Sequence, residues 1–262
     1  MKIAKAHGIG NDFLLVAEAD APADIAPWAQ RLCDRHIGVG ADGVLLHSLV
    51  PDGVRMRLIN ADGGEVELSG NGLRCLAGYM VWSGARPARL VVHTVAGPRP
   101  VDVTTIGPGR YRIATDLGEA RVDAVDHPLS VGGETVDVTT TWLGNPHCAV
   151  FLDAPAHDAL LSRLGPLLEH HAFFPRRTNV EFVSVPSRSE LRVRFWERGV
   201  GYTRASGTGS ASAAVAAIAK GLADRRLRVV CDGGTLDVEW PEGGHVHQVG
   251  EVEIVFEGSW LL

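Results

Sequence analysis

Short apolar runs separated by turn-forming residues dominate this chain of 262 residues. The runs are rich in Val, Ile and Leu, and Gly, Pro, Asn or Asp stand between them, which is typical of β-strands. The strands predicted in this way are Asp12–Ala17, Gly43–Ser48, Val54–Asn60, Arg89–Thr94, Val101–Thr105, Arg110–Ala114, Ala149–Leu152, Asn179–Val185, Arg192–Glu197, Arg228–Cys231, Thr235–Trp240 and Glu251–Phe256.

Four segments carry helix signals instead: Pro27–Asp34, Gly70–Ser83, Asp158–His170 and Gly207–Gly221. The last segment is rich in alanine. Ser206 stands at its start, where serine caps helices well, and its final residue, Gly221, is a favourable cap at its end. Many strands with a few long helices predict an α+β fold rather than a regular alternation of strands and helices.

The sequence also contains an internal repeat. Ser69-Gly-Asn-Gly72 matches Ser206-Gly-Thr-Gly209 at an offset of 137 residues, and Gly10-Asn11 matches Gly144-Asn145 at an offset of 134. Both offsets are close to half the chain length, so we expect a duplicated fold with two similar halves and a cleft between them.

Composition excludes several classes of function. The net charge of −6 argues against a general nucleic-acid binder, which needs a basic surface. The N-terminus lacks the apolar region of a signal peptide, and the chain has no stretch of 18 apolar residues, so we expect no membrane span. The four cysteines are widely spaced and form no metal-binding pattern, which favours buried thiols in a reducing cytoplasm and no metal site.

Glycine-rich motifs supply the candidate chemistry. Gly38-Val-Gly-Ala-Asp-Gly43 has the letters of a dinucleotide fingerprint, but a helix precedes it and a strand follows, so we reject nucleotide binding. The two Ser-Gly-x-Gly motifs instead open helices. Unpaired backbone N–H groups and the helix dipole favour an anion there, a carboxylate or a phosphate. The alternative is that each serine simply caps its helix, with no ligand.

The motifs, in order along the chain, resemble those of the diaminopimelate epimerase family. They are His7-Gly-Ile-Gly-Asn-Asp-Phe13, Asp34–Gly43, Asn60-Ala-Asp-Gly63, Ser69–Cys75, Gly144-Asn-Pro-His147, Thr178-Asn179, Trp196–Gly201, Ala205–Gly209 and Val255–Gly258. The resemblance implies two pseudo-symmetric α+β lobes, each a curved β-sheet around a central helix. It places residues 1–115 with the C-terminal strand 251–262 in one lobe, and residues 116–250 in the other.

The resemblance also implies roles for individual residues. The family epimerises its substrate without a cofactor, and a pair of cysteines serves as thiolate base and thiol acid on opposite faces of the α-carbon. His147 and Glu197 would support the acid/base pair, and Arg198 can bind a carboxylate in a bidentate manner. The residues that would bind the substrate are Asn11, Asn60, Gly70, Asn71, Asn145, Asn179, Arg198, Gly207 and Thr208.

The sequence departs from the family at the two catalytic positions, which are occupied by Ser69 and Ser206. A serine hydroxyl is much less acidic than a thiol, each pKa unit costs about 1.36 kcal/mol, and a helix dipole returns at most about 2 kcal/mol. Serine therefore needs an adjacent base, such as His147. Four interpretations stay open: a natural epimerase with altered bases, an engineered inactive form, an enzyme for a related reaction such as dehydration of a hydroxy-amino acid, or a non-catalytic binder.

The resemblance implies a cofactor-independent amino-acid epimerase, which we expect to be cytoplasmic. The reaction that the resemblance implies is the interconversion of LL- and meso-diaminopimelate in lysine and peptidoglycan precursor biosynthesis. Ser69 and Ser206 occupy the acid/base positions. The expected partners are a small amino-acid substrate and a second copy of the chain in a homodimer, with neither nucleic acid nor membrane. The alternatives are a serine-variant racemase or dehydratase for another amino acid, and an amino-acid binder.

Overall fold

The computed structural model describes residues 1–261, which form two compact units. Unit 1 comprises Met1–Asp116 together with the chain from Val249 onward, and unit 2 comprises Leu117–Gln248. Within residues 1–261, no helix is long and apolar enough to cross a membrane.

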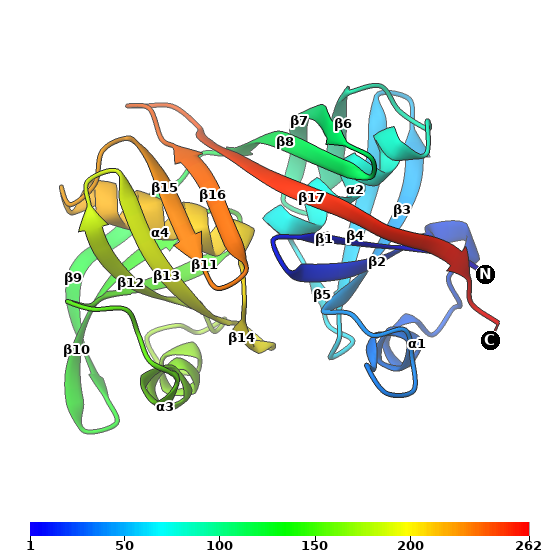
Figure 1. Cartoon of the computed structure of the whole chain (residues 1–262). Coiled ribbons are helices and arrows are strands. Elements are labelled where there is room, and N and C mark those ends of the chain that lie inside the picture. The colour runs from blue at the N-terminus through cyan, green and yellow to red at the C-terminus, as the bar shows by residue number, and fades with distance from the viewer. Residues whose placement is uncertain (262) are drawn as a thin grey trace. The chain divides into compact units, whose positions relative to one another are not determined.

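Unit 1 is built from a sheet with helices on both faces (Figure 1). Its helices are α1 (Ile25–Cys33) and α2 (Gly70–Trp82), and a short 3-10 helix covers Glu18–Asp20. Its strands are β1 (Lys2–Gly8), β2 (Asn11–Ala17), β3 (Gly43–Val50), β4 (Gly53–Asn60), β5 (Glu65–Val66), β6 (Arg89–Thr94), β7 (Gly97–Gly107) and β8 (Arg110–Gly118), together with most of β17 (Val246–Ser259).

Alternation along the strands explains why both faces of this sheet are covered. On β2, Phe13 and Leu15 join the core around α2, whereas Leu14 and Val16 join the core on the α1 side. Helix α2 contacts β1, β2, β3, β4, β6 and β7, and every residue from Gly70 to Met80 is buried. The first turn of α2 is therefore held rigidly in the middle of the unit.

Unit 2 has the same plan (Figure 1). Its helices are α3 (Asp158–Glu169) and α4 (Gly207–Ala219). Its strands are β9 (Arg121–Val131), β10 (Glu134–Trp142), β11 (Pro146–Phe151), β12 (Asn179–Ser187), β13 (Glu190–Glu197), β14 (Gly201–Thr203), β15 (Arg226–Cys231) and β16 (Gly234–Glu239).

Here too the strands bury alternate side chains against a helix on each face. On β11, Ala149 belongs to the core around α4, while Cys148 and Val150 belong to the core around α3. Helix α4 contacts β9, β10, β11, β12, β13, β15 and β16, and every residue from Gly207 to Ala217 is buried. Its alanines allow this close approach to the sheet because their side chains are small.

The strand pairings of unit 1 recur in unit 2, as expected for a duplicated fold. In unit 1, β2 pairs in parallel with β3, β3 antiparallel with β4, β4 in parallel with β6, and β6 antiparallel with β7. In unit 2, the same directions recur for β11 with β12, β12 with β13, β13 with β15, and β15 with β16. Helices α2 and α4 each have 13 residues and begin 137 residues apart. The α+β fold and its duplication are therefore confirmed.

The sequence patterns missed one ribbon. Strands β9 and β10 form a long antiparallel pair in unit 2, with register shifts near Thr140. Much of β9 is exposed, and it carries His127 and Pro128, so its apolar positions are too few to give a clear alternation. The N-terminal strand β1 was missed as well. It pairs antiparallel with β17 through residues from Lys2 to Gly8.

A glycine with positive φ directly precedes each of the two asparagines at the start of the repeat. Gly10 has φ of 86° and Gly144 has φ of 80°, values that glycine adopts without the steric cost of a Cβ atom. Each glycine reverses the chain directly before an asparagine, Asn11 in unit 1 and Asn145 in unit 2. Both asparagines are nearly buried as a result.

Candidate functional site

Ser69 caps the first turn of α2. Its hydroxyl accepts a hydrogen bond from the backbone N–H of Gly72 at 3.1 Å, and its carbonyl accepts the N–H of Leu73 at 2.9 Å. The capping role considered for this serine is therefore present. In any α-helix the N–H groups of the first turn have no acceptor inside the helix. The Ser69 cap satisfies the N–H of Gly72, the third residue of α2. The N–H of Gly70 lies closer to the helix end, where a carboxylate would be favoured.

A chain of amides runs beside this helix start. Asn11 Nδ2 donates to Asp42 Oδ2 at 2.7 Å, and Asn11 Oδ1 accepts from Asn71 Nδ2 at 3.1 Å. Asn71 Oδ1 in turn accepts from Arg74 Nη2, which belongs to a fully buried side chain. Because a carboxylate only accepts and a guanidinium only donates, Asp42 and Arg74 determine how both amides are oriented.

Two neighbouring carboxylates share one arginine at this end of unit 1. Arg35 lies 2.8 Å from Asp12 and 2.9 Å from Asp42, and Lys5 lies 2.8 Å from Asp12. Although burial opposes ionisation, the bonds from Arg35 and Lys5 lower the pKa of Asp12 to about 2. Burial and the charge of Asp12 raise the pKa of Asp42. Neither aspartate was predicted as a site residue, but Asp42 holds Asn11 in place.

Ser206 caps α4 in the same manner, but its hydroxyl has a second partner. The oxygen accepts the backbone N–H of Gly209 at 3.2 Å and donates to Glu197 Oε2 at 3.2 Å. The other carboxylate oxygen of Glu197 accepts from the hydroxyl of Thr203 at 2.6 Å. Ser206 therefore has a carboxylate within hydrogen-bond distance that can receive its proton, and Thr203 fixes the orientation of that carboxylate.

His147 is hydrogen-bonded to two other side chains of unit 2. Its Nδ1 is 2.7 Å from Glu181 Oε1, and its Nε2 is 2.7 Å from Asn145 Oδ1. Both ring nitrogens are thus engaged by other side chains. Burial raises the pKa of Glu181, and the neighbouring His147 opposes that shift. Glu197 rather than His147 is the polar neighbour that the structure gives to Ser206.

Asn179 and Arg198 are joined through the backbone. Asn179 Oδ1 accepts the backbone N–H of Arg198 at 3.0 Å, and Asn179 Nδ2 donates to the carbonyl of Pro146 at 3.0 Å. The Arg198 guanidinium donates to the carbonyl of Arg176 at 3.3 Å. Asn179 therefore ties the end of β13 to the start of β11, close to Asn145 in sequence.

Asn60 stands apart from these networks. It is the last residue of β4, pairs with Gly43 of β3, and is only partly buried. Within unit 1, the described residues give its side chain no hydrogen-bond partner. Its amide can both donate and accept, which is the property that the resemblance uses to assign it to the substrate.

The glycines of the two helix starts have more than one task. A Cβ atom on Gly209 would lie 2.9 Å from Ser206 Oγ and 3.0 Å from Phe195, and one on Gly72 would lie 3.1 Å from Leu45. These distances are too short for an undisturbed side chain. Gly72 and Gly209 therefore make room for the capping serine and for the sheet.

Two fully buried thiols, those of Cys75 and Cys148, cannot replace the missing thiolates. Cys75 lies in α2, and burial raises its pKa to about 12. Cys148 follows His147 and is also fully buried, and its pKa is raised well above the usual range for the same reason. A thiol with such a pKa stays protonated at neutral pH, so it supplies no base.

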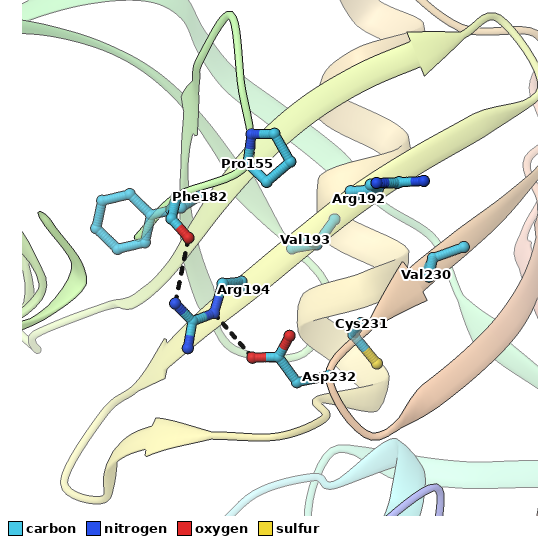
Figure 2. A pocket seen from close by; sticks show the side chains of 9 residues that line it. Pro155, Phe182, Arg192, Val193, Arg194, Val230, Cys231 and Asp232 are labelled. Atoms are coloured by element: carbon cyan, nitrogen blue, oxygen red, sulfur yellow. Dashed lines mark hydrogen bonds and ion pairs between the residues drawn. The ribbon is translucent and has the colours of Figure 1, made fainter. Parts of the chain in front are cut away.

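Unit 2 also contains a cavity away from these residues. It has a volume of about 240 Å³ and is lined by residues that include Phe182, Arg192, Arg194, Cys231 and Asp232 (Figure 2). Figure 2 shows Arg194 bound to Asp232, a contact of 2.8 Å. None of the predicted site residues lines this cavity.

Comparison with known proteins identifies the family. The family model described as diaminopimelate epimerase matches residues 3–122 and 139–255. The chain belongs to the diaminopimelate epimerase family. Diaminopimelate epimerases of Pelotomaculum thermopropionicum and Desulforudis audaxviator are 42% and 43% identical to it. The alignments cover 99% and 100% of this chain, and 99% of each relative. As a member of the family, the chain is an isomerase of the epimerase and racemase type.

Solved structures agree on the fold. A predicted epimerase from Pseudomonas aeruginosa superposes with a TM-score of 0.77 at 17% identity, covering 100% of this chain and 99% of the other. A hydroxyproline epimerase from Agrobacterium vitis gives a TM-score of 0.75 at 14% identity, covering 98% and 90%. At such low identity these likenesses show that the diaminopimelate epimerase family shares its fold with other epimerases.

Proposed function

We propose that this chain interconverts LL- and meso-diaminopimelate without a cofactor, with Ser69 and Ser206 as its acid/base pair. The observation that carries the proposal is the hydrogen bond of 3.2 Å from Ser206 Oγ to Glu197 Oε2 at the start of α4. It gives one of the two serines a proton acceptor, which a serine base needs. Family membership supports the substrate, since the curated relatives are diaminopimelate epimerases.

Substrate binding in this proposal uses groups that match a zwitterionic amino acid. The N–H groups at the starts of α2 and α4, from Gly70, Asn71, Gly207 and Thr208, bind the α-carboxylate, with the helix dipoles favouring its charge. Asn11, Asn60, Asn145 and Asn179 bind the remaining ammonium and carboxylate groups, because an amide both donates and accepts. Arg198 binds a carboxylate in a bidentate manner.

The chemical step moves one proton off the α-carbon and one proton on. Ser206 gives its own proton to Glu197 as its oxygen takes the α-proton, and Ser69 delivers its own proton to the opposite face. Water then restores the starting state, because it reprotonates the Ser69 alkoxide and takes the proton from Glu197. The reverse reaction runs through the same steps in the opposite order. A serine alkoxide is costly, at about 1.36 kcal/mol for each pKa unit above that of a thiol. We therefore expect slow turnover compared with a two-cysteine epimerase.

Deuterium exchange tests this proposal directly. Diaminopimelate incubated with the protein in D₂O should take up deuterium at its α-carbon, as followed by NMR or mass spectrometry. The double variant Ser69→Cys/Ser206→Cys should exchange about 10²–10⁴ times faster, the range in which acid/base groups contribute. The control is Ser184→Ala, which removes a buried hydroxyl on β12 that has no hydrogen-bond partner among the described residues. If the double cysteine variant exchanges no deuterium into diaminopimelate either, the substrate assignment is wrong.

Two other functions give different results in the same assays. A non-catalytic amino-acid binder would bind diaminopimelate, and the natural chain would then show no exchange. The capping bonds of both serines favour this alternative, because they give each hydroxyl a structural role. A serine-variant dehydratase would release water or ammonia from hydroxyproline-like substrates. Either result in place of exchange would replace the epimerase proposal.

The proposal extends to the setting of the protein. By resemblance to its family, the chain is expected to act as a homodimer in the cytoplasm, on a precursor of lysine and peptidoglycan. Sedimentation velocity of the purified protein measures the assembly. A single species at the mass of one 27.9 kDa chain would contradict the dimer without affecting the proposed reaction.

A further inference from the structure

Asn145, His147 and Glu181 form a buried chain of hydrogen bonds in unit 2. The His147 ring joins the other two, with Nδ1 at 2.7 Å from Glu181 Oε1 and Nε2 at 2.7 Å from Asn145 Oδ1. The side chains of His147 and Glu181 are 0% and 1% exposed. Asn145, at 7% exposure, is the member closest to solvent.

The backbone holds this chain in register. His147 lies on β11 and Glu181 on β12, and these strands pair in parallel with Ala149 opposite Glu181. Gly144, with φ of 80°, turns the chain directly before Asn145. His147 and Glu181 therefore cannot move without disturbing a pair of central strands.

The chemistry of the three groups determines which atom donates. The oxygen of an amide only accepts, so His147 Nε2 must carry a proton and donate it to Asn145 Oδ1. This holds whether the second proton of the pair resides on His147 Nδ1 or on Glu181, because Nδ1 and Oε1 share it in either case. With its oxygen turned toward the histidine, Asn145 keeps its NH₂ group for another partner.

We propose that Glu181 is a positioning residue: through His147, it fixes the amide of Asn145 so that the NH₂ group faces the substrate. This inference rests on the proposed function, in which Asn145 binds substrate. An NH₂ group offers donors only, so Asn145 selects a carboxylate oxygen and rejects an ammonium group at that point.

A purely structural role for Glu181 explains the geometry less well. The backbone N–H of Cys148 also bonds to the Glu181 carboxylate and opposes the rise of its pKa, but within residues 1–261 its Oε2 is buried without a hydrogen-bond partner, which costs stability. A buried ion pair is also a poor source of stability, since desolvation offsets its attraction. A structural role and a positioning role predict different losses when the carboxylate is neutralised, one in stability and the other in affinity.

The first test measures diaminopimelate binding by calorimetry for the full chain and for Glu181→Gln. Glutamine keeps the size of the side chain but does not dictate the protonation of His147, so we expect Kd to rise about tenfold, the equivalent of 1.4 kcal/mol. The matched control is Ser184→Ala on the same strand, with a change of less than about twofold. An unchanged Kd in Glu181→Gln would overturn the proposal.

A double-mutant cycle shows whether Glu181 acts through Asn145. Asn145→Ala removes the amide that receives the effect, so adding Glu181→Gln should change Kd by less than about twofold in that background. If the two losses multiply, Glu181 acts by another route and the proposal is wrong. Glu181→Asp, which keeps a carboxylate, should bind more tightly than Glu181→Gln.

Histidine ¹⁵N NMR on the ligand-free protein tests the geometry without reference to any substrate. The His147 signal, identified by its loss in His147→Gln, should show a protonated Nε2 in a hydrogen bond. An unprotonated Nε2 would mean that Asn145 presents its oxygen instead, and would overturn the inference even if Glu181→Gln failed to fold. Lack of diaminopimelate binding by the natural chain would contradict the proposed function, while the NMR result would still decide the orientation of Asn145.

Discussion

The two helix starts have the same frame and different neighbours. Ser69 and Ser206 each cap a 13-residue helix through the N–H of the third helical residue, at 3.1 and 3.2 Å. Ser206 also donates to a carboxylate. Within the described part of unit 1, Ser69 has no bond of that kind.

The repeat shows where the difference arises. Strands β4 and β13 both have eight residues and end 137 residues apart, the same offset as the two serines, at Asn60 and Glu197. The position that supplies a proton acceptor to Ser206 is therefore a neutral amide in the half that holds Ser69. We infer that the duplicated frame was kept while the last residue of the matching strand was fitted for proton transfer in one half, as Glu197, and for binding in the other, as Asn60.

The largest effect that follows from this comparison is expected for Glu197→Gln. The variant keeps a hydrogen-bond partner for Ser206 but cannot receive its proton, so deuterium exchange into diaminopimelate should fall about 10²-fold, the lower end for an acid/base group. In a Ser206→Ala background the same change should have little further effect, because the two residues act together. Equal losses in both backgrounds would separate Glu197 from Ser206.

Asn60→Ala should show the opposite division between rate and affinity. Loss of one binding amide should raise KM about tenfold and leave the exchange rate at saturation within about threefold of the natural chain, as for an interaction made equally before and during the reaction. Steady-state measurements on the two variants side by side distinguish these patterns. A fall in kcat for Asn60→Ala as large as that for Glu197→Gln would contradict the division of roles.

The smallest effects concern stability. Loss of an N-cap serine costs about 1 kcal/mol, so Ser69→Ala and Ser206→Ala should each lower the free energy of unfolding by that amount in urea titrations. Ser206→Ala should cost more, because it also deprives the Glu197 carboxylate of a donor. Equal losses would mean that the contact with Glu197 contributes nothing to folding. Ser184→Ala again serves as the control for removing a buried hydroxyl.

Strong local signals made part of this architecture predictable from sequence. The two Ser-Gly-x-Gly motifs marked both buried helices and their caps, because serine and glycine have specific tasks at a helix start. The ribbon of β9 and β10 was not predictable, since its many exposed residues dilute the apolar pattern.

The polar networks were the hardest part to predict. Asp42 and Glu181 orient asparagines that lie more than 30 residues away in sequence, and such contacts depend on strand pairing rather than on local pattern. One signal was available for Glu181, a single charge inside the apolar run that became β12. A buried charge of this kind needs a partner, so it indicates a polar network, but the sequence does not identify the other residues of that network.

The pairing of β1 with β17 has a consequence for folding during synthesis. Lys2 lies opposite Ser259, and the backbones of Met1 and Trp260 exchange hydrogen bonds. Unit 1 is therefore completed by two segments, one that precedes unit 2 in the sequence and one that follows it. During synthesis, all of unit 2 leaves the ribosome before the last strand of unit 1 is made, because unit 2 is one continuous segment. Strand β1 must wait for β17 with one edge unpaired, and an open edge invites aggregation. We therefore expect unit 1 to be the unit more exposed to aggregation until synthesis of the chain is complete.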